Sequence, residues 1–329
     1  MPRIAVGFRY EIRGNFTGAV KAGTEKYGES KMEIEHLRGL IAAPHTPFDR
    51  NGMVAYPVIR QQAELLLEQG VTGAYVSGTT GEGVSCSVEE RLKVMDAWSE
   101  ASAGRLKLIV HIGALSIRDV ETLGRHANEL RVHATSVVPP NYFKPASLAS
   151  LVRFCALAAA TAPDTAFYYY HTVMSGVTFP MDRFLEAADG VIPNLAGIKF
   201  NSPDLYMYQN CRHACGGRYD IVYGVDEFFA GALALGAECF IGSTYNYMAP
   251  TYLEVWEAFR RGDMAGVDRG MRKACLGVDI LVKHGGVAAG KAMMLAHGVD
   301  CGDPRPPLDS LDDAAKQRIV EEFRRIIAR

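Results

Sequence analysis

Residues 165–200 read TAFYYYHTVMSGVTFPMDRFLEAADGVIPNLAGIKF, and this stretch decides the fold class. Its two ends, 165–170 and 195–200, are short runs of apolar and aromatic residues of the kind that form buried strands. Between them, residues 182–188 carry apolar side chains at helical spacing. A strand, a helix and a second strand in this order form a βαβ unit, in which the two strands pair in parallel.

The same alternation continues on both sides of this unit. We expect eight strands, at residues 39–43, 73–76, 106–112, 134–138, 165–170, 195–200, 219–223 and 238–241. Seven amphipathic helices are expected between them, at 56–69, 88–101, 117–130, 148–162, 182–188, 203–215 and 227–235. Eight such units in about 210 residues are typical of a (β/α)8 TIM barrel, an α/β fold. A doubly wound open sheet is the alternative, but no expected strand is followed by the GxGxxG of its dinucleotide-binding form.

Three parts are predicted along the chain. Residues 1–36 precede the first strand, and we interpret them as an N-terminal extension that is poorly ordered or loosely docked. Residues 37–250 are expected to form the barrel. Residues 251–329 are expected to form a C-terminal helical region packed on it, because helical patterns at 252–261, 271–283, 290–296 and 312–328 follow one another without a strand between them.

The composition excludes several classes of partner. Hydrophobic residues make up 48% and charged residues 22% of the chain, as in an ordinary globular protein, and the formal net charge is -2 without a block of like charges. We therefore expect neither a nucleic acid nor an anionic membrane surface as partner. No apolar run approaches the ~20 residues that a membrane-spanning helix needs.

The cysteines indicate the compartment. Their number, seven, is odd and they are scattered, which argues against a disulfide framework and favours the reducing cytoplasm. Cys211 and Cys215 flank His213, but the spacing is not that of a zinc site and no second pair accompanies them. We expect no metal.

Lys199 is the residue with the strongest chemical implication. It ends an apolar stretch, 191–198, and the carboxyl ends of barrel strands carry the active sites of this fold. Burial disfavours the charged form of an amine, and a neutral amine forms Schiff bases with carbonyl substrates. In the alternative interpretation Lys199 only extends its ammonium to solvent at the strand end. Lys107 begins its strand instead, so it is expected at the opposite end of the barrel.

Polar residues lie at the end of, or just after, three other expected strands. The segment 77–83, SGTTGEG, offers backbone amides and two hydroxyls that suit a small anion such as a carboxylate, or it is a turn before a helix N-cap. The segment 168–171, YYYH, offers a tyrosine or His171 as a proton carrier, unless these residues only pack in the core. Asp226 and Glu227 could bind sugar hydroxyls, or simply begin a helix.

Taken in order, the motifs resemble those of a known superfamily. GTTGE at 78–82, YYYH at 168–171, GIKF at 197–200, YGVDE at 223–227 and GSTYNY at 242–247 are similar to the motifs of the pyruvate-dependent class I aldolases. This superfamily includes the dihydrodipicolinate synthases and the N-acetylneuraminate lyases, and YYYH, GVDE and GSTYNY look specific to the lyase branch. The resemblance covers residues 37–329, and residues 1–36 have no counterpart in it.

The resemblance implies a Schiff-base lyase that needs no cofactor. Lys199 would form an imine with the C2 keto group of open-chain N-acetylneuraminate, and retro-aldol cleavage would release N-acetylmannosamine and then pyruvate. Thr79 and Thr80 would hold the substrate carboxylate, where fixed donors match its charge. The family also implies a homotetramer.

By the same resemblance, a tyrosine at the end of the fifth strand takes the proton of the C4 hydroxyl. The motif assigns this role to Tyr170, which with Lys199 and Thr79 completes the predicted catalytic group of one chain. The family's proline is missing after His171, and the segment is one residue short, so an alignment from the downstream side would select Tyr169. Tyr142 matches a tyrosine that reaches the proton relay from a neighbouring subunit, and we count it among the catalytic residues.

Other matched positions would bind the rest of the substrate. The hydroxylated tail is held in the family at positions that correspond to Gly224, Asp226, Glu227, Gly242 and Ser243. Asn201 stands where the lyases usually carry serine or threonine. It can still form hydrogen bonds, but it leaves open which substituent is preferred at C4.

Three alternatives stay open. Dihydrodipicolinate synthases use an arginine before a Thr-Gly-Val turn, whereas this chain has Val173 or Met174 there and no arginine between Arg153 and Arg183. Another aldolase or dehydratase acting on 2-keto-3-deoxy sugar acids would use the same lysine. A catalytically idle member would only bind a keto acid, as a sensor.

Overall fold

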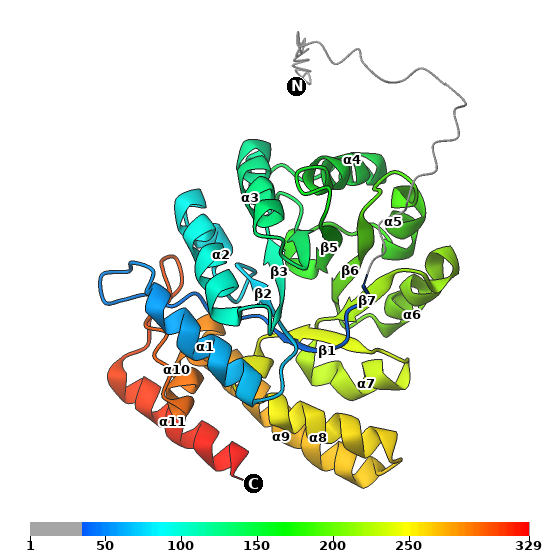
Figure 1. Cartoon of the computed structure of the whole chain (residues 1–329). Helices are drawn as coiled ribbons and strands as arrows, with labels where there is room; N and C mark the ends of the chain where they lie inside the picture. Colours follow the sequence, from blue (N-terminus) through cyan, green and yellow to red (C-terminus); the bar gives the residue numbers. More distant parts are fainter. Residues whose placement is uncertain (1–34, 329) are drawn as a thin grey trace, which may run out of the picture. The chain divides into compact units, whose positions relative to one another are not determined.

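The strands form one closed parallel barrel in chain order, as predicted (Figure 1). The structure is a computed structural model and describes residues 35–328. Each strand differs from its predicted range by at most two residues at either end. The strands are β1 (Gly39–Ala42), β2 (Gly73–Val76), β3 (Lys107–His111), β4 (Ala134–Val137), β5 (Ala166–Thr172), β6 (Leu195–Asn201), β7 (Asp220–Tyr223) and β8 (Cys239–Gly242). The predicted N-terminal extension, residues 1–36, lies outside the described residues except for its last two positions.

A helix follows each strand, and these eight helices surround the barrel (Figure 1). They are α1 (Tyr56–Glu68), α2 (Val88–Ser102), α3 (Ile117–Glu129), α4 (Leu148–Ala159), α5 (Met181–Ala188), α6 (Leu205–His213), α7 (Phe229–Ala234) and α8 (Ala249–Arg260). Three more helices follow: α9 (Met264–Lys283), α10 (Val287–Met294) and α11 (Asp313–Ile327). Between residues 35 and 328, no helix has the length and apolar character needed to span a membrane.

The eighth helix begins earlier than the sequence pattern indicated. The predicted boundary between residues 250 and 251 falls inside α8, because Pro250 occupies its first turn, where proline is favoured. The next helix, α9, also begins earlier than residue 271. Its start is capped by Asp263, whose carboxylate accepts a hydrogen bond of 2.8 Å from the Gly266 amide. Glycines at 266 and 270 interrupt the helical pattern in the sequence and hide this first part.

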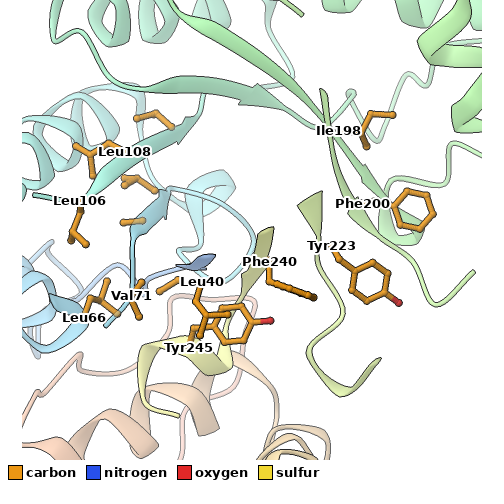
Figure 2. Packing of buried hydrophobic residues seen from close by; sticks show 14 of the residues in the cluster. Leu40, Leu66, Val71, Leu106, Leu108, Ile198, Phe200, Tyr223, Phe240 and Tyr245 are labelled. Atoms are coloured by element: carbon orange, nitrogen blue, oxygen red, sulfur yellow. The ribbon is translucent and has the colours of Figure 1, made fainter. Parts of the chain in front are cut away.

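Two hydrophobic clusters divide the side chains of the strands between them. The larger cluster joins strand residues to the surrounding helices; Leu40, Phe200, Tyr223 and Phe240 belong to it (Figure 2). The smaller cluster consists almost entirely of strand residues, among them Ile41, Tyr75, Ile109, Tyr168, Tyr170 and Val222. It therefore fills the inside of the barrel. Membership of one cluster or the other tells whether a strand residue points inward or toward the helices.

An irregularity in the pairing of β5 with β6 sets the register of the site. The pairing shifts between Phe167 and Tyr168, so that Tyr168 lies opposite Gly197 and Tyr170 lies opposite Lys199. Gly197 permits this arrangement, because a side chain there would collide with the carbonyl group of Asp220 on β7. The shift means that a simple inside–outside alternation does not continue through β6.

Candidate active site

Lys199 lies in β6 with its side chain inside the barrel. The residue is only 5% exposed, and its Nζ lies 3.6 Å from the centre of the Tyr170 ring and 4.8 Å from that of Tyr75. The described part of the chain contains one other buried lysine, Lys291, which pairs with Glu82, whereas no described carboxylate pairs with Lys199. A buried amine without a counter-ion is available for chemistry, and the interpretation of a lysine that extends to solvent does not fit its burial.

Tyr170 occupies the register position opposite Lys199 on β5. Its hydroxyl lies 3.3 Å from the Thr79 hydroxyl. Burial raises the pKa of Tyr170, but the Lys199 charge and hydrogen bonds from the side chains of Thr79, Lys199 and Thr172 outweigh it, so the pKa lies below its ordinary value. A tyrosine with a lowered pKa gives up its proton more readily, as a general base must. The structure thus brings Lys199, Tyr170 and Thr79 together.

The residues on either side of Tyr170 point toward the helices. Tyr169 packs against Phe184 of α5 with ring centres 4.6 Å apart, and burial raises its pKa. His171 packs against Phe200 at 5.1 Å, and burial lowers its pKa to about 4. Since Tyr169 and Phe200 belong to the outer cluster, neither Tyr169 nor His171 faces Lys199. Strand β5 also continues to Thr172, so Tyr170 lies within the strand and not at its end.

The GTTGE motif forms a tight loop at the carboxyl end of β2. Ser77 and Glu82 adopt left-handed backbone conformations, with φ of 57° and 51°. The Gly83 amide donates a hydrogen bond of 3.1 Å to the Gly78 carbonyl and closes the loop. Thr79 is exposed at its tip and Thr80 is half-buried. Three glycines allow backbone amides and hydroxyls to gather on this side of the barrel.

The positions predicted to bind the substrate tail lie at or just after the carboxyl ends of β6, β7 and β8. Asp226 is buried: one carboxylate oxygen accepts hydrogen bonds from the Thr244 amide at 3.0 Å and hydroxyl at 2.7 Å. Its other oxygen, Oδ1, has no hydrogen-bond partner among the described residues. Burial raises the pKa of Asp226 in spite of the bonds from Thr244. A side chain at Gly242 would collide with Oδ1, so only glycine fits beside this buried carboxylate.

The remaining tail positions are less enclosed. The Asn201 side chain lies next to Gly224. A Cβ added to Gly224 would be 2.9 Å from Oδ1 of Asn201. Ser243 is partly buried, whereas Glu227 is exposed. All of these residues lie at or just after the carboxyl ends of their strands, on the same side of the barrel as the GTTGE loop. Their hydroxyl, amide and carboxylate groups are those that bind a polyhydroxylated chain.

Tyr142 lies apart from this group within one chain. It belongs to the segment between β4 and α4, is 79% exposed, and packs edge-on against Phe143 with ring centres 5.0 Å apart. The neighbouring Phe143 is 84% exposed. The role of Tyr142 in proton transfer from a neighbouring subunit stays a prediction.

Comparison with known proteins assigns the family. The family model of the dihydrodipicolinate synthetases matches residues 36–326, which include the whole barrel and all but the end of α11. The chain belongs to the dihydrodipicolinate synthetase family. Among the curated relatives, the N-acetylneuraminate lyase of Mus musculus is 37% identical over 293 residues, which cover 87% of this chain and 89% of that protein.

Solved structures of this family are similar over the same region. The N-acetylneuraminate lyase of Proteus mirabilis has a TM-score of 0.88 at 54% identity, covering 89% of this chain and 99% of that one. The N-acetylneuraminate lyase, or sialic acid aldolase, of Aliivibrio salmonicida has a TM-score of 0.88 at 50% identity, covering 89% and 97% of the two chains.

Two inward-facing residues of this family member escaped the sequence analysis. Tyr75 of β2 lies edge-on to Tyr170 with ring centres 5.7 Å apart, and its hydroxyl donates a hydrogen bond of 3.0 Å to Ser136. His111 of β3 lies 6.2 Å from the Tyr170 ring, and burial and the charges of Arg91 and Lys199 lower its pKa to about 3. It is therefore neutral. Their positions near the carboxyl ends of barrel strands were the signal that could have revealed them.

Histidines, cysteines and carboxylates are the side chains that hold metal ions in proteins. Within residues 35–328, no group of three or more such side chains is placed to hold an ion. All seven cysteines lie in this range and are free. The Tyr170 ring lies next to the Lys199 amine, and the Thr79 hydroxyl lies 3.3 Å from the Tyr170 hydroxyl.

Proposed function

We propose that this protein is an N-acetylneuraminate lyase, which cleaves N-acetylneuraminate to pyruvate and N-acetylmannosamine through an imine at Lys199. One observation carries the mechanism: a buried amine without a counter-ion faces Tyr170, whose hydroxyl is 3.3 Å from Thr79 of the GTTGE loop. The substrate is supported by the relatives named N-acetylneuraminate lyase. Those of Mus musculus and Homo sapiens align with 87% and 83% of this chain.

The first step is attack of the Lys199 amine on the C2 keto carbon of the open-chain sugar acid. A carbon–nitrogen bond forms, the carbonyl oxygen leaves as water, and the product is an imine. Thr79, Thr80 and backbone amides of the loop hold the neighbouring carboxylate. Because these donors are already placed by the loop, little reorganisation is needed when the substrate binds.

Tyr170 then takes the proton from the C4 hydroxyl. The C3–C4 bond breaks, its electron pair moves onto the imine to form an enamine, and N-acetylmannosamine leaves with its new aldehyde group. The enamine is protonated at C3, and water hydrolyses the imine to release pyruvate and the free amine. The lowered pKa of Tyr170 suits a residue that accepts and returns one proton in each cycle. No cofactor takes part in these steps.

The substrate tail is assigned to the polar groups after β6, β7 and β8. The free Oδ1 of Asp226 accepts a hydroxyl, and Asn201, Gly224, Gly242 and Ser243 line the path of the chain. Glu227, which is exposed, contacts the outer end of the tail. A dihydrodipicolinate synthase would need a cation for a second carboxylate, and the sequence has no arginine between Arg153 and Arg183.

We also propose that the active form is a homotetramer in the cytoplasm. The exposed pair Tyr142 and Phe143 would be covered by a neighbouring chain, and Tyr142 of the partner subunit would complete the proton relay. The seven free cysteines agree with a reducing compartment. Light scattering after gel filtration measures the state of assembly, and a monomer that is fully active would contradict this assignment.

A coupled assay tests the function directly. Pyruvate release is measured from N-acetylneuraminate and from a panel of 2-keto-3-deoxy sugar acids, with pyruvate condensation as the reverse reaction. We expect the highest kcat/KM with N-acetylneuraminate. Faster cleavage of a shorter 2-keto-3-deoxy acid would assign the protein to another aldolase activity. Binding of keto acids without turnover would make it a sensor.

A further inference from the structure

The glutamate of the GTTGE motif is buried beneath the loop that carries Thr79 and Thr80. Glu82 is 3% exposed and adopts a left-handed backbone conformation, with φ of 51°. The catalytic steps above give it no task. A carboxylate is rarely buried unless it is paired, so its surroundings explain why it is there.

Both oxygens of Glu82 face groups from the C-terminal region. Oε1 lies 2.8 Å from Nζ of Lys291, a residue of α10, and the two side chains are each 1% exposed. Oε2 accepts a hydrogen bond of 2.8 Å from the backbone amide of Arg305, in the segment between α10 and α11. Lys291 also donates a hydrogen bond of 3.1 Å to the Asp303 carbonyl. One buried ion pair thus joins the loop to a region outside the eight strand–helix units.

Further contacts extend this connection around the loop. The Arg305 guanidinium pairs with Glu90 at the start of α2, at 2.5 Å, and donates to the Gly52 carbonyl at 2.7 Å. On the other side, the Thr46 hydroxyl donates to the Gly81 carbonyl at 2.5 Å. The loop is therefore held at Gly81 and Glu82, while its tip at Thr79 and Thr80 stays available to a ligand.

We infer that Glu82 and Lys291 are positioning residues that fix the Thr79–Thr80 loop at the distance from Lys199 that the substrate carboxylate requires. This inference rests on the proposed function. Removing either charge would leave the other buried without a partner, and the loop would shift to bring it to water. The shift would misplace the donors for the carboxylate. Tyr170 on β5 and Lys199 on β6 would keep their places, because the pairing of the two strands holds them.

The inference predicts a loss that is specific for the carboxylate. In the variant Lys291→Met, the pyruvate concentration that half-saturates borohydride trapping at Lys199 should rise about tenfold or more, since small displacements of positioning groups have large effects. Trapping of acetone, a ketone without a carboxylate, should stay within about twofold of wild type on the same reasoning. The KM for N-acetylneuraminate should rise in parallel, with a smaller change in kcat.

Two further variants complete the experiment. Lys93→Met, in the exposed pair of Lys93 with Glu89 at 2.7 Å, makes the same substitution away from the loop and should behave as wild type. The double variant Glu82→Gln with Lys291→Met removes both charges, so it should fold even where Lys291→Met alone does not. It should show the same loss for pyruvate, because the ion pair that fixes the loop is gone.

The outcomes separate the two proposals. If wild type traps pyruvate at Lys199 but the folded variants show unchanged half-saturation, the positioning role is overturned and the proposed function stands. An equal loss of pyruvate and acetone trapping also overturns it, because the pair would then support the whole barrel. If wild type traps no pyruvate, the proposed function itself fails, and the inference fails with it.

Discussion

The Lys199 amine lies over the face of the Tyr170 ring, with its Nζ 3.6 Å from the ring centre. The two residues are register partners on adjacent strands, so backbone hydrogen bonds of the barrel hold them in place. A ring face attracts a cation, and a phenolate attracts it more strongly. The Lys199 charge lowers the pKa of Tyr170, which suits a site where the amine attacks a carbonyl carbon and the tyrosine takes a proton.

Replacement of Lys199 should abolish turnover. Lys199→Ala removes the nucleophile, and Lys199→Arg should be equally inactive because a guanidinium stays protonated. Loss of a covalent nucleophile lowers kcat by several orders of magnitude, about 10⁴-fold or more. Pyruvate release and mass spectrometry after borohydride reduction with pyruvate measure both effects. Near-normal cleavage by Lys199→Ala would disprove the imine mechanism.

Tyr170→Phe and Tyr169→Phe form a matched pair of variants. Tyr170→Phe should lower kcat by about 10²–10⁴-fold, the usual contribution of a general acid–base group, while imine trapping with pyruvate continues. Tyr169→Phe should keep its activity within about twofold, because its hydroxyl is buried without a hydrogen-bond partner among the described residues. The opposite result would assign the proton transfer to Tyr169.

The barrel itself could be predicted from local patterns, because the strands appear as short apolar runs and most helices show apolar residues at helical spacing. The choice between Tyr169 and Tyr170 could not. Both faces of a barrel strand are buried, so both tyrosines fit the same apolar run. The register between β5 and β6, with its shift near Tyr168, decides which one faces Lys199, and register depends on strands that are distant in the sequence.

The partner of Glu82 could not be predicted from the sequence either. GTTGE is visible as a motif, but Lys291 lies in a helix of the C-terminal region, and no periodicity indicates which loop that helix covers. The eighth helix was likewise assigned to the C-terminal region, because Pro250 and the residues before it hide its first turn. A local sequence pattern predicts a helix or a strand, but it does not predict which other elements that helix or strand packs against.

Gly242→Ala should weaken binding of the substrate tail without affecting the keto acid. The added methyl group would collide with Asp226 Oδ1 and displace the acceptor assigned to a substrate hydroxyl. We expect kcat/KM for N-acetylneuraminate to fall about tenfold, the effect of one lost hydrogen bond to a charged group, while pyruvate trapping stays unchanged.

Gly231→Ala in α7 is the control for this variant. A methyl group there would meet only a Leu205 side-chain carbon, at 3.2 Å, and it lies within a helix, where alanine is favoured over glycine. Its kinetics should match those of wild type. Equal losses in both variants would mean that Gly242→Ala acts through the fold and not through Asp226.

Stability should fall in acid because of two buried histidines. Burial and neighbouring positive charges lower the pKa of His45 and of His111 from 6.5 to about 3 in the folded protein. Below pH 6.5 the unfolded chain binds protons at these residues and the folded chain does not, so the free energy of unfolding decreases as pH falls toward 3. Each histidine contributes a slope of about 1.4 kcal/mol per pH unit in this window.

Urea unfolding between pH 7 and pH 4 measures this slope, at one protein concentration. In His45→Gln the slope should be smaller by about 1.4 kcal/mol per pH unit, since glutamine does not titrate. An unchanged slope in His45→Gln would mean that His45 takes up its proton inside the folded protein, next to Lys291 and beneath the GTTGE loop, and the electrostatic description of this region would be wrong.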